Sequence, residues 1–200
     1  MSAPGDMEGW LHAYAWGLPN GVKGLIEQLT KWSQNQTLRH QDEKPNARVT
    51  YTEGPMLYIG QQICKRMAKM GYPAKIAVHW RSAEQQNKEF VEGDSKAKAW
   101  QSPHQFGEAV DIVHKTLGWS VPDEFWAALS VCVRIIEAEL RVSLVHGRTW
   151  GWDQAHVELK DWRTVRDAQK ARGALFYHKP TQDELLTRWK QVLPGIRIPV

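Results

Sequence analysis

The sequence contains little cysteine and no long hydrophobic run. Only two of its 200 residues are cysteines, Cys64 and Cys132, and both stand in apolar helical patterns. We predict two buried thiols, because this spacing suits neither a metal site nor a disulfide framework. No stretch approaches the roughly eighteen apolar residues of a membrane span. The N-terminus also lacks the cationic and apolar segments of a signal peptide, so we expect synthesis in the cytoplasm without stable membrane association.

The chain also lacks a dense run of charge of either sign. Its formal net charge is +4 and its pI is about 9.1, with lysines and arginines scattered along the chain. A mildly basic surface can favour an anionic polymer such as a cell wall or a nucleic acid, although ordinary solvation explains any single cluster. Because no Lys/Arg stripe or named nucleic-acid-binding module is present, we predict no nucleic-acid partner.

Several common enzyme motifs are missing as well. The sequence has no His-Glu-x-x-His, no phosphate-binding glycine loop with lysine, no Gly-x-Gly-x-x-Gly and no Gly-x-Ser-x-Gly. These absences argue against the metalloprotease, nucleotide-binding, dinucleotide-binding and serine-hydrolase classes that carry them.

The length and the hydrophobic pattern predict one α+β domain. Two hundred residues suit a single domain that buries its core without disulfide or metal staples, and repeats are absent. We expect a monomer with a small, mainly antiparallel sheet that carries the site and helices packed around it. The domain spans 1–200, with a motif-bearing core at about 70–160, N-terminal helices within 6–69 and C-terminal helices within 162–193. Expected helices are 6–17, 21–34, 55–69, 83–91, 123–140, one that begins at 162, and 184–193. Expected strands are 75–81, 109–113, 142–146 and 155–159.

The segment 102–111 is the first of two that suggest a functional site. It places His104 and Asp111 seven residues apart, which is too far for neighbours on one helix face. Gly107 lies between them, where a Cβ would hinder a tight turn. The alternation over 109–113 predicts a strand, with Asp111 on an apolar face.

The second segment, 150–158, contains Asp153 in a predicted turn and His156 at the start of a predicted strand. Together, His104, Asp111 and His156 offer two imidazoles and one carboxylate, the donor set of a catalytic zinc ion with a fourth position left for water. The alternative is two hydrogen-bonded core histidines, but it leaves Asp111 as a costly unpaired carboxylate. His114 is a weaker candidate ligand.

These segments resemble the family of zinc-dependent D-alanyl-D-alanine carboxypeptidases and dipeptidases and L-alanyl-D-glutamate endopeptidases, which includes VanY/VanX-like enzymes and phage endolysin peptidases. The resemblance covers about residues 70 to 160. It rests on Ser102-x-His104-x-x-Gly107-x-Ala109-x-Asp111, on Asp153-x-x-His156-x-Glu158, and on Arg81-Ser82 before a Glu/Gln-rich helix. Two positions depart from the pattern: His79-Trp80 stands where Gly-Tyr is usual, and Ala155 stands where a proline often precedes the second histidine.

The resemblance implies a role for each site residue. Asp153 matches the general base, although aspartate is also a common turn former. Arg81 matches the group that binds the developing oxyanion, with a surface cation as the alternative. Glu158 is expected to hold the ring of the ligand His156 through its other nitrogen. Ser102 either bonds the substrate backbone or caps the turn. The tryptophans that flank the motifs either pack or line a substrate groove; they are Trp100, Trp150 and Trp152.

The resemblance also implies a substrate, the peptidoglycan stem peptide, and a cofactor, Zn²⁺. We favour an L-Ala-D-Glu endopeptidase of the phage or prophage endolysin type. The alternatives are a D-Ala-D-Ala carboxypeptidase or dipeptidase, and a non-catalytic cell-wall-binding or virion protein. Since a secretion signal is missing, we expect lysis machinery or a virion to deliver the protein to the wall.

Overall fold

The computed structural model describes residues 53–171 and 178–197, which belong to one compact unit, Lys44–Val200. The helices expected at 6–17 and 21–34 lie outside the described residues. None of the described helices is long and apolar enough to cross a membrane.

A four-stranded sheet forms the centre of the fold and confirms the α+β prediction. Its strands are β1 (Ala74–Val78), β2 (Ala109–His114), β3 (Leu144–His146) and β4 (His156–Leu159), in the order β1-β2-β4-β3. Every neighbouring pair is antiparallel. All six residues of β2 are buried, because this strand has a neighbour on each edge and packing on both faces.

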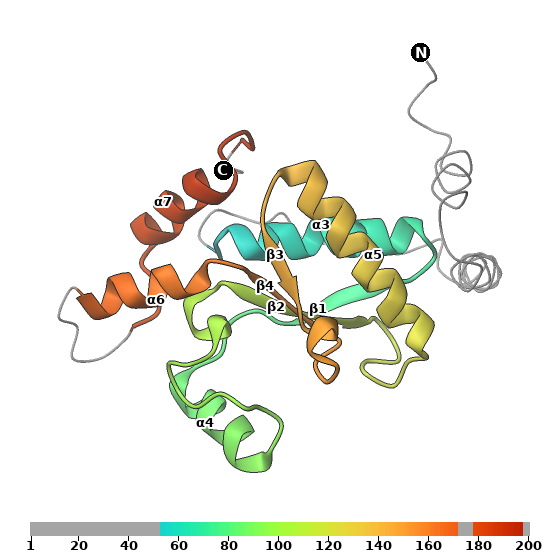
Figure 1. The fold of residues 1–200 in the computed structure, drawn as a ribbon, viewed down its shortest axis with the longest axis horizontal. Coiled ribbons are helices and arrows are strands. Elements are labelled where there is room, and N and C mark those ends of the chain that lie inside the picture. Colours follow the sequence, from blue (N-terminus) through green and yellow to red (C-terminus); the bar gives the residue numbers. More distant parts are fainter. Residues whose placement is uncertain (1–52, 172–177, 198–200) are drawn as a thin grey trace. The chain divides into compact units, whose positions relative to one another are not determined.

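Two long helices cover one side of the sheet. Helix α3 (Pro55–Lys69) packs on β1 and β2, and α5 (Asp123–Leu140) crosses α3 and reaches β3 (Figure 1). Gly60 permits the close approach of α3, since a Cβ there would lie 2.9 Å from Ile76 Cδ1. The two cysteines, Cys64 and Cys132, are buried between these layers as predicted, and burial raises the pKa of each thiol to about 12.

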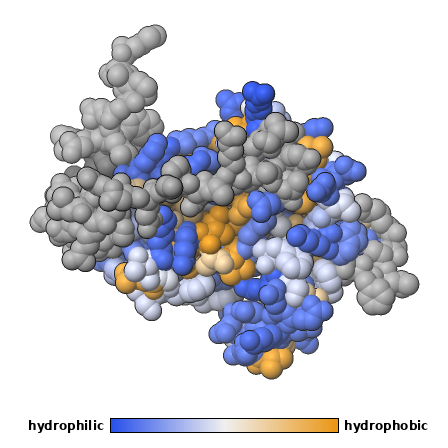
Figure 2. All heavy atoms as spheres, turned by 180° about the vertical axis from the view of Figure 1, so that it is seen from behind, coloured by the Kyte–Doolittle hydropathy of each residue, from blue (hydrophilic) through white to orange (hydrophobic). Residues whose placement is uncertain are grey.

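Helix α4 (Ala83–Glu92) projects from the other side of the molecule (Figure 1). Ser82 caps it: its side chain accepts from the Gln85 backbone N–H while the Gln85 side chain accepts from Ser82 N–H. Gly93 ends the helix with a left-handed φ of 85°. The lobe formed by α4 and the loop after it is mainly hydrophilic on the face shown in Figure 2.

Helices α6 (Trp162–Ala171) and α7 (Gln182–Val192) form the C-terminal part of the described fold. Arg188 of α7 bonds the buried carboxylate of Glu108 at 2.7 Å and the carboxylate of Asp161 at 2.6 Å. Removing one partner from such a buried pair leaves an uncompensated charge, at a cost of about 3–5 kcal/mol. The Arg188–Glu108 ion pair therefore links α7 to the residue immediately before β2.

The bounds of all four strands differ from the sequence-based expectation; β1 begins one residue earlier, at Ala74, and β2 ends one residue later, at His114. The strand expected at 75–81 ends at Val78, so His79 and Arg81 do not share a strand face. The chain leaves the sheet there because the register shifts between Ile76 and Val78, and Arg81 N–H instead donates to the carbonyl of His104 at 3.3 Å. The strand expected from 142 begins at 144, since Val142 N–H still bonds the Glu137 carbonyl of α5. The strand expected from 155 begins at 156.

Candidate metal centre

Three separate elements bring His104, Asp111 and His156 together. Asp111 lies in the middle of β2, and the antiparallel register places it directly opposite His156, the first residue of β4. His104 lies in a short 3-10 helix, η2 (Pro103–Phe106), which Gly107 ends with a φ of 71°. This left-handed turn, which favours glycine, returns the chain to β2 and confirms the turn predicted at Gly107.

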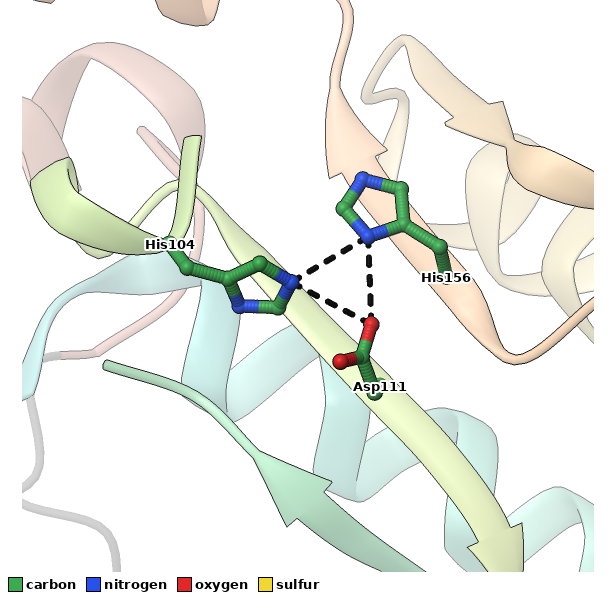
Figure 3. Close-up of side chains that lie close together, drawn as sticks. All are labelled: His104, Asp111 and His156. Atoms are coloured by element: carbon green, nitrogen blue, oxygen red, sulfur yellow. Dashed lines mark hydrogen bonds and ion pairs between the residues drawn. The ribbon is translucent and has the colours of Figure 1, made fainter. Parts of the chain in front are cut away.

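The ligand atoms of these residues converge on one point (Figure 3). Asp111 Oδ1 lies 3.2 Å from His104 Nε2 and 3.1 Å from His156 Nδ1, and the two nitrogens are 3.2 Å apart. Zinc bonds of about 2.0–2.1 Å in a tetrahedral site separate neighbouring ligand atoms by about 3.3 Å. All three side chains are buried, so the cluster matches one face of such a site.

The hydrogen bonds behind the two rings fix their tautomers. His104 Nδ1 lies 3.1 Å from the His79 carbonyl oxygen, and His156 Nε2 lies 3.1 Å from Glu158 Oε2. Both oxygens only accept, so each of these nitrogens carries the ring proton. In the neutral rings, the nitrogens that face Asp111 therefore present lone pairs. Two nitrogen lone pairs and a carboxylate oxygen at one point attract a cation, either a proton shared with Asp111 or a metal ion.

The electrostatics of the cluster favour the same conclusion. Burial alone would lower the pKa of His156, but its hydrogen bonds to Asp111 and Glu158 raise it to about 9. Burial alone would raise the pKa of Asp111, but His104 and His156 hold it well below its usual range. The site thus keeps its carboxylate ionised and favours positive charge at its centre.

Arg81 lies beside the cluster and is largely buried, with a side chain 14% exposed. Its Nη2 is 3.6 Å from Asp111 Oδ2, the carboxylate oxygen that faces away from the histidines. Its Nη1 donates to Gln86 Oε1 at 3.2 Å. This environment does not fit a surface cation; the oxyanion-binding role stays a prediction.

Asp153 lies half-buried in the turn between a second 3-10 helix, η3 (Gly147–Trp150), and β4. Burial raises the pKa of its carboxyl, Asp111 raises it further, and His156 and His104 oppose the change. The carboxyl therefore lies within electrostatic range of all three members of the cluster. A backbone hydrogen bond from His156 also lowers this pKa, and a turn-forming aspartate makes the same kind of local contact. Its role as general base stays a prediction.

Three other residues singled out from the sequence lie in or near the cluster or apart from it. Glu158 holds the His156 ring as predicted, and Ser102 is buried at the N-terminus of η2, where its side chain makes no capping hydrogen bond. His114 lies outside the cluster, and its Nδ1 accepts the backbone N–H groups of Thr116 and Leu117 at 3.1 Å.

Two of the three flanking tryptophans are exposed beside the site. Trp150 and Trp152 are 41% and 46% exposed, and their ring centroids stack 5.8 Å apart. The Trp150 ring lies 5.4 Å from the ring of His156. Trp100 instead contacts the buried ring of Phe106, with ring centroids 6.3 Å apart, so only the other two remain candidates to line a substrate groove.

Gly147 is a site-supporting residue that the sequence analysis missed. A Cβ at this position would lie 2.2 Å from the Asp153 carbonyl oxygen and 3.1 Å from the Cβ atoms of Asp153 and His156. Gly147→Ala should therefore push the turn and His156 outward. Since a misplacement of about 1 Å can cost about 10²-fold in rate, we expect at least a roughly tenfold loss of metal affinity or turnover.

Zinc titration and hydrolysis rates of the purified variant test this expectation. Gly195→Ala is the matched control, because a Cβ at Gly195 has no neighbour within 4 Å. Equal behaviour of the two variants would contradict the steric role of Gly147.

A comparison with solved structures found a likeness of fold. No family model matches the chain, and no curated protein matches its sequence. The fold is similar to the crystal structure of Serratia marcescens L-Ala D-Glu endopeptidase ChiX, with 22% sequence identity and a TM-score of 0.47; the match covers 63% of this chain and 98% of that chain. The likeness is one of fold, so the description of the site rests on the side chains of this chain.

Proposed function

We propose that this protein is a zinc-dependent peptidase that hydrolyses peptidoglycan stem peptides. The observation that carries the proposal is the meeting of three lone-pair-bearing atoms from His104, Asp111 and His156, with both ring tautomers set by outer hydrogen bonds. Two imidazoles and one carboxylate suit zinc, and three protein ligands are typical of its catalytic sites. A bound zinc ion would act as a Lewis acid that polarises the scissile carbonyl and makes water a better nucleophile.

Two residues beside the cluster carry out proton transfer and oxyanion stabilisation. Asp153 accepts a proton from the attacking water and passes it to the leaving amine, as a positioned general acid/base does. Arg81 donates hydrogen bonds to the oxyanion that develops on the scissile carbonyl. Its contact with the outer oxygen of Asp111, at 3.6 Å, keeps the guanidinium beside the proposed metal site and supports this role.

The motif resemblance favours the L-Ala-D-Glu bond as the one cleaved. The D-Ala-D-Ala bond is the second candidate, because the same constellation serves both reactions. In each bond, the residue that leaves with the amine carries a free α-carboxylate, so the two substrates present similar chemistry to the site. A non-catalytic wall-binding protein is less consistent with a site that keeps the ligand set together with Arg81 and Asp153.

Zinc analysis and mass spectrometry of digested muropeptides test the proposal together. We expect about one zinc ion per chain, in line with three protein ligands, and soluble peptides that begin at D-Glu. Loss of only the terminal D-Ala would instead support the second bond. A protein that neither takes up zinc nor cleaves either bond would contradict the proposed function.

Arg81→Ala should slow hydrolysis by roughly 10²-fold while the protein keeps its fold and zinc, since losing an oxyanion donor commonly has this effect. Steady-state kinetics beside zinc content provide the measurement. Arg134→Ala is the matched control, because Arg134 is an exposed arginine of α5 that pairs only with Glu137 among the described residues. An unchanged kcat/KM in Arg81→Ala would remove Arg81 from the mechanism.

A further inference from the structure

The loop after α4 is tied to the metal-site region by a buried amide, Gln86. Gln86 is fully buried, and its Nε2 donates to Ser95 Oγ at 2.8 Å and to the Ala97 carbonyl at 2.7 Å. Its Oε1 accepts from Arg81 Nη1 at 3.2 Å. The donor and the acceptor of the amide are therefore both hydrogen-bonded. These bonds give the 95–97 segment a defined position relative to Arg81 and the cluster.

This loop carries Lys96 to the aromatic side of the site. Lys96 Nζ lies 4.1 Å from the centroid of the Trp152 ring. Trp152 stacks on Trp150, whose ring in turn lies against the ring of His156. The ammonium thus stands at the outer end of an aromatic stack that begins at a metal-ligand ring.

Lys96 has no acidic partner among the described residues, whereas Lys88 of the same lobe pairs with Glu92. The Trp152 face attracts the ammonium, but a ring quadrupole does not neutralise its charge. An exposed cation that is held in place without a counter-ion is available to an anionic ligand, and its side chain loses little further freedom on binding.

We propose that Lys96, held over Trp152, binds a carboxylate of the peptide substrate. This inference rests on the proposed function, because stem peptides carry free carboxylates beyond the scissile bond. The contact lies at the outer end of the stack rather than at the reacting atoms. It therefore stabilises ground state and transition state alike, and its loss raises KM without changing kcat.

Two peptides that differ only in charge test the proposal: an anionic stem peptide and the same peptide with its carboxylates converted to carboxamides. Lys96→Ala should raise KM for the anionic peptide roughly fivefold, as expected of a partly exposed ion pair. It should leave kcat and the kinetics of the carboxamide peptide unchanged. Lys96→Arg should retain most of the affinity, and the difference should shrink in high salt.

Lys98→Ala is the matched control, because Lys98 lies on the same loop but over the ring of Phe90, 5.2 Å from its centroid. An equal rise in KM in the Lys98 variant, or no rise in Lys96→Ala, would overturn the role of Lys96.

Isothermal titration calorimetry separates this proposal from the proposed function. The titrants are the two peptides and the anionic product expected from cleavage. If the protein hydrolyses neither peptide but binds the anionic one in a Lys96-dependent manner, the peptidase assignment fails and the role of Lys96 stands. If hydrolysis proceeds while Lys96→Ala binds the product as tightly as the original protein does, the role of Lys96 fails alone. Binding of neither peptide overturns both.

Discussion

His156→Ala should leave a folded protein that has lost its zinc and its activity. The substitution removes one of the three proposed ligands found among the described residues, the one that forms the β4 side of the cluster opposite Asp111. The loss of zinc affinity should exceed the roughly 10–100-fold that is typical when only an outer partner of a ligand is removed. Zinc content after dialysis, thermal unfolding and hydrolysis rate provide the measurements.

Two further variants serve as controls for this result. Glu158→Gln removes the carboxylate behind the His156 ring, at 3.1 Å, and should weaken zinc binding by only about 10–100-fold. His178→Ala removes an exposed histidine, whose Nδ1 bonds the neighbouring carbonyl of Lys179, and should change neither zinc content nor rate. Full zinc occupancy in His156→Ala would contradict the ligand assignment.

The regular elements could be predicted closely because their signals are local. Helices Pro55–Lys69 and Asp123–Leu140 have the predicted bounds, since an apolar stripe and an early proline are visible in the sequence itself. The start of α7 was also visible, because Thr181 and Glu184 form a capping box that the prediction of a helix from 184 overlooked. The end of β1 was not visible, since it depends on a hydrogen bond between Arg81 and the distant residue His104.

In the site, too, residues with a local sequence signal could be predicted, and residues that depend on distant contacts could not. The His104, Asp111 and His156 cluster followed from motif spacing, and the structure brings these residues together. Gln86 could not be identified, because a glutamine in a Glu/Gln-rich helix has the pattern of a solvated residue until its three partners are known. Gly147 was missed for a related reason: its importance comes from the backbone of Asp153, which only the folded turn brings close.

Asp153→Ala should fail in a different way from His156→Ala, although the two positions are three residues apart. Asp153 is not one of the three converging ligands, yet its carboxyl interacts with all of them. The variant should therefore bind zinc and fold. Hydrolysis should fall by roughly 10²–10⁴-fold, the usual contribution of a positioned acid/base, because no group remains to accept the proton of the attacking water.

Asp153→Asn and Asp153→Glu make the test of the general base sharper. Asparagine keeps the size of the side chain and can still accept a hydrogen bond from the His156 backbone, but it cannot take up the proton, so it should be as inactive as alanine. Glutamate restores the carboxylate with one more methylene and should recover part of the rate. The measurement is zinc content beside kcat for all three variants. If Asp153→Asn keeps its rate, or if it loses its metal, Asp153 is not the base, and Glu158, the other carboxylate in contact with His156, becomes the next residue to test.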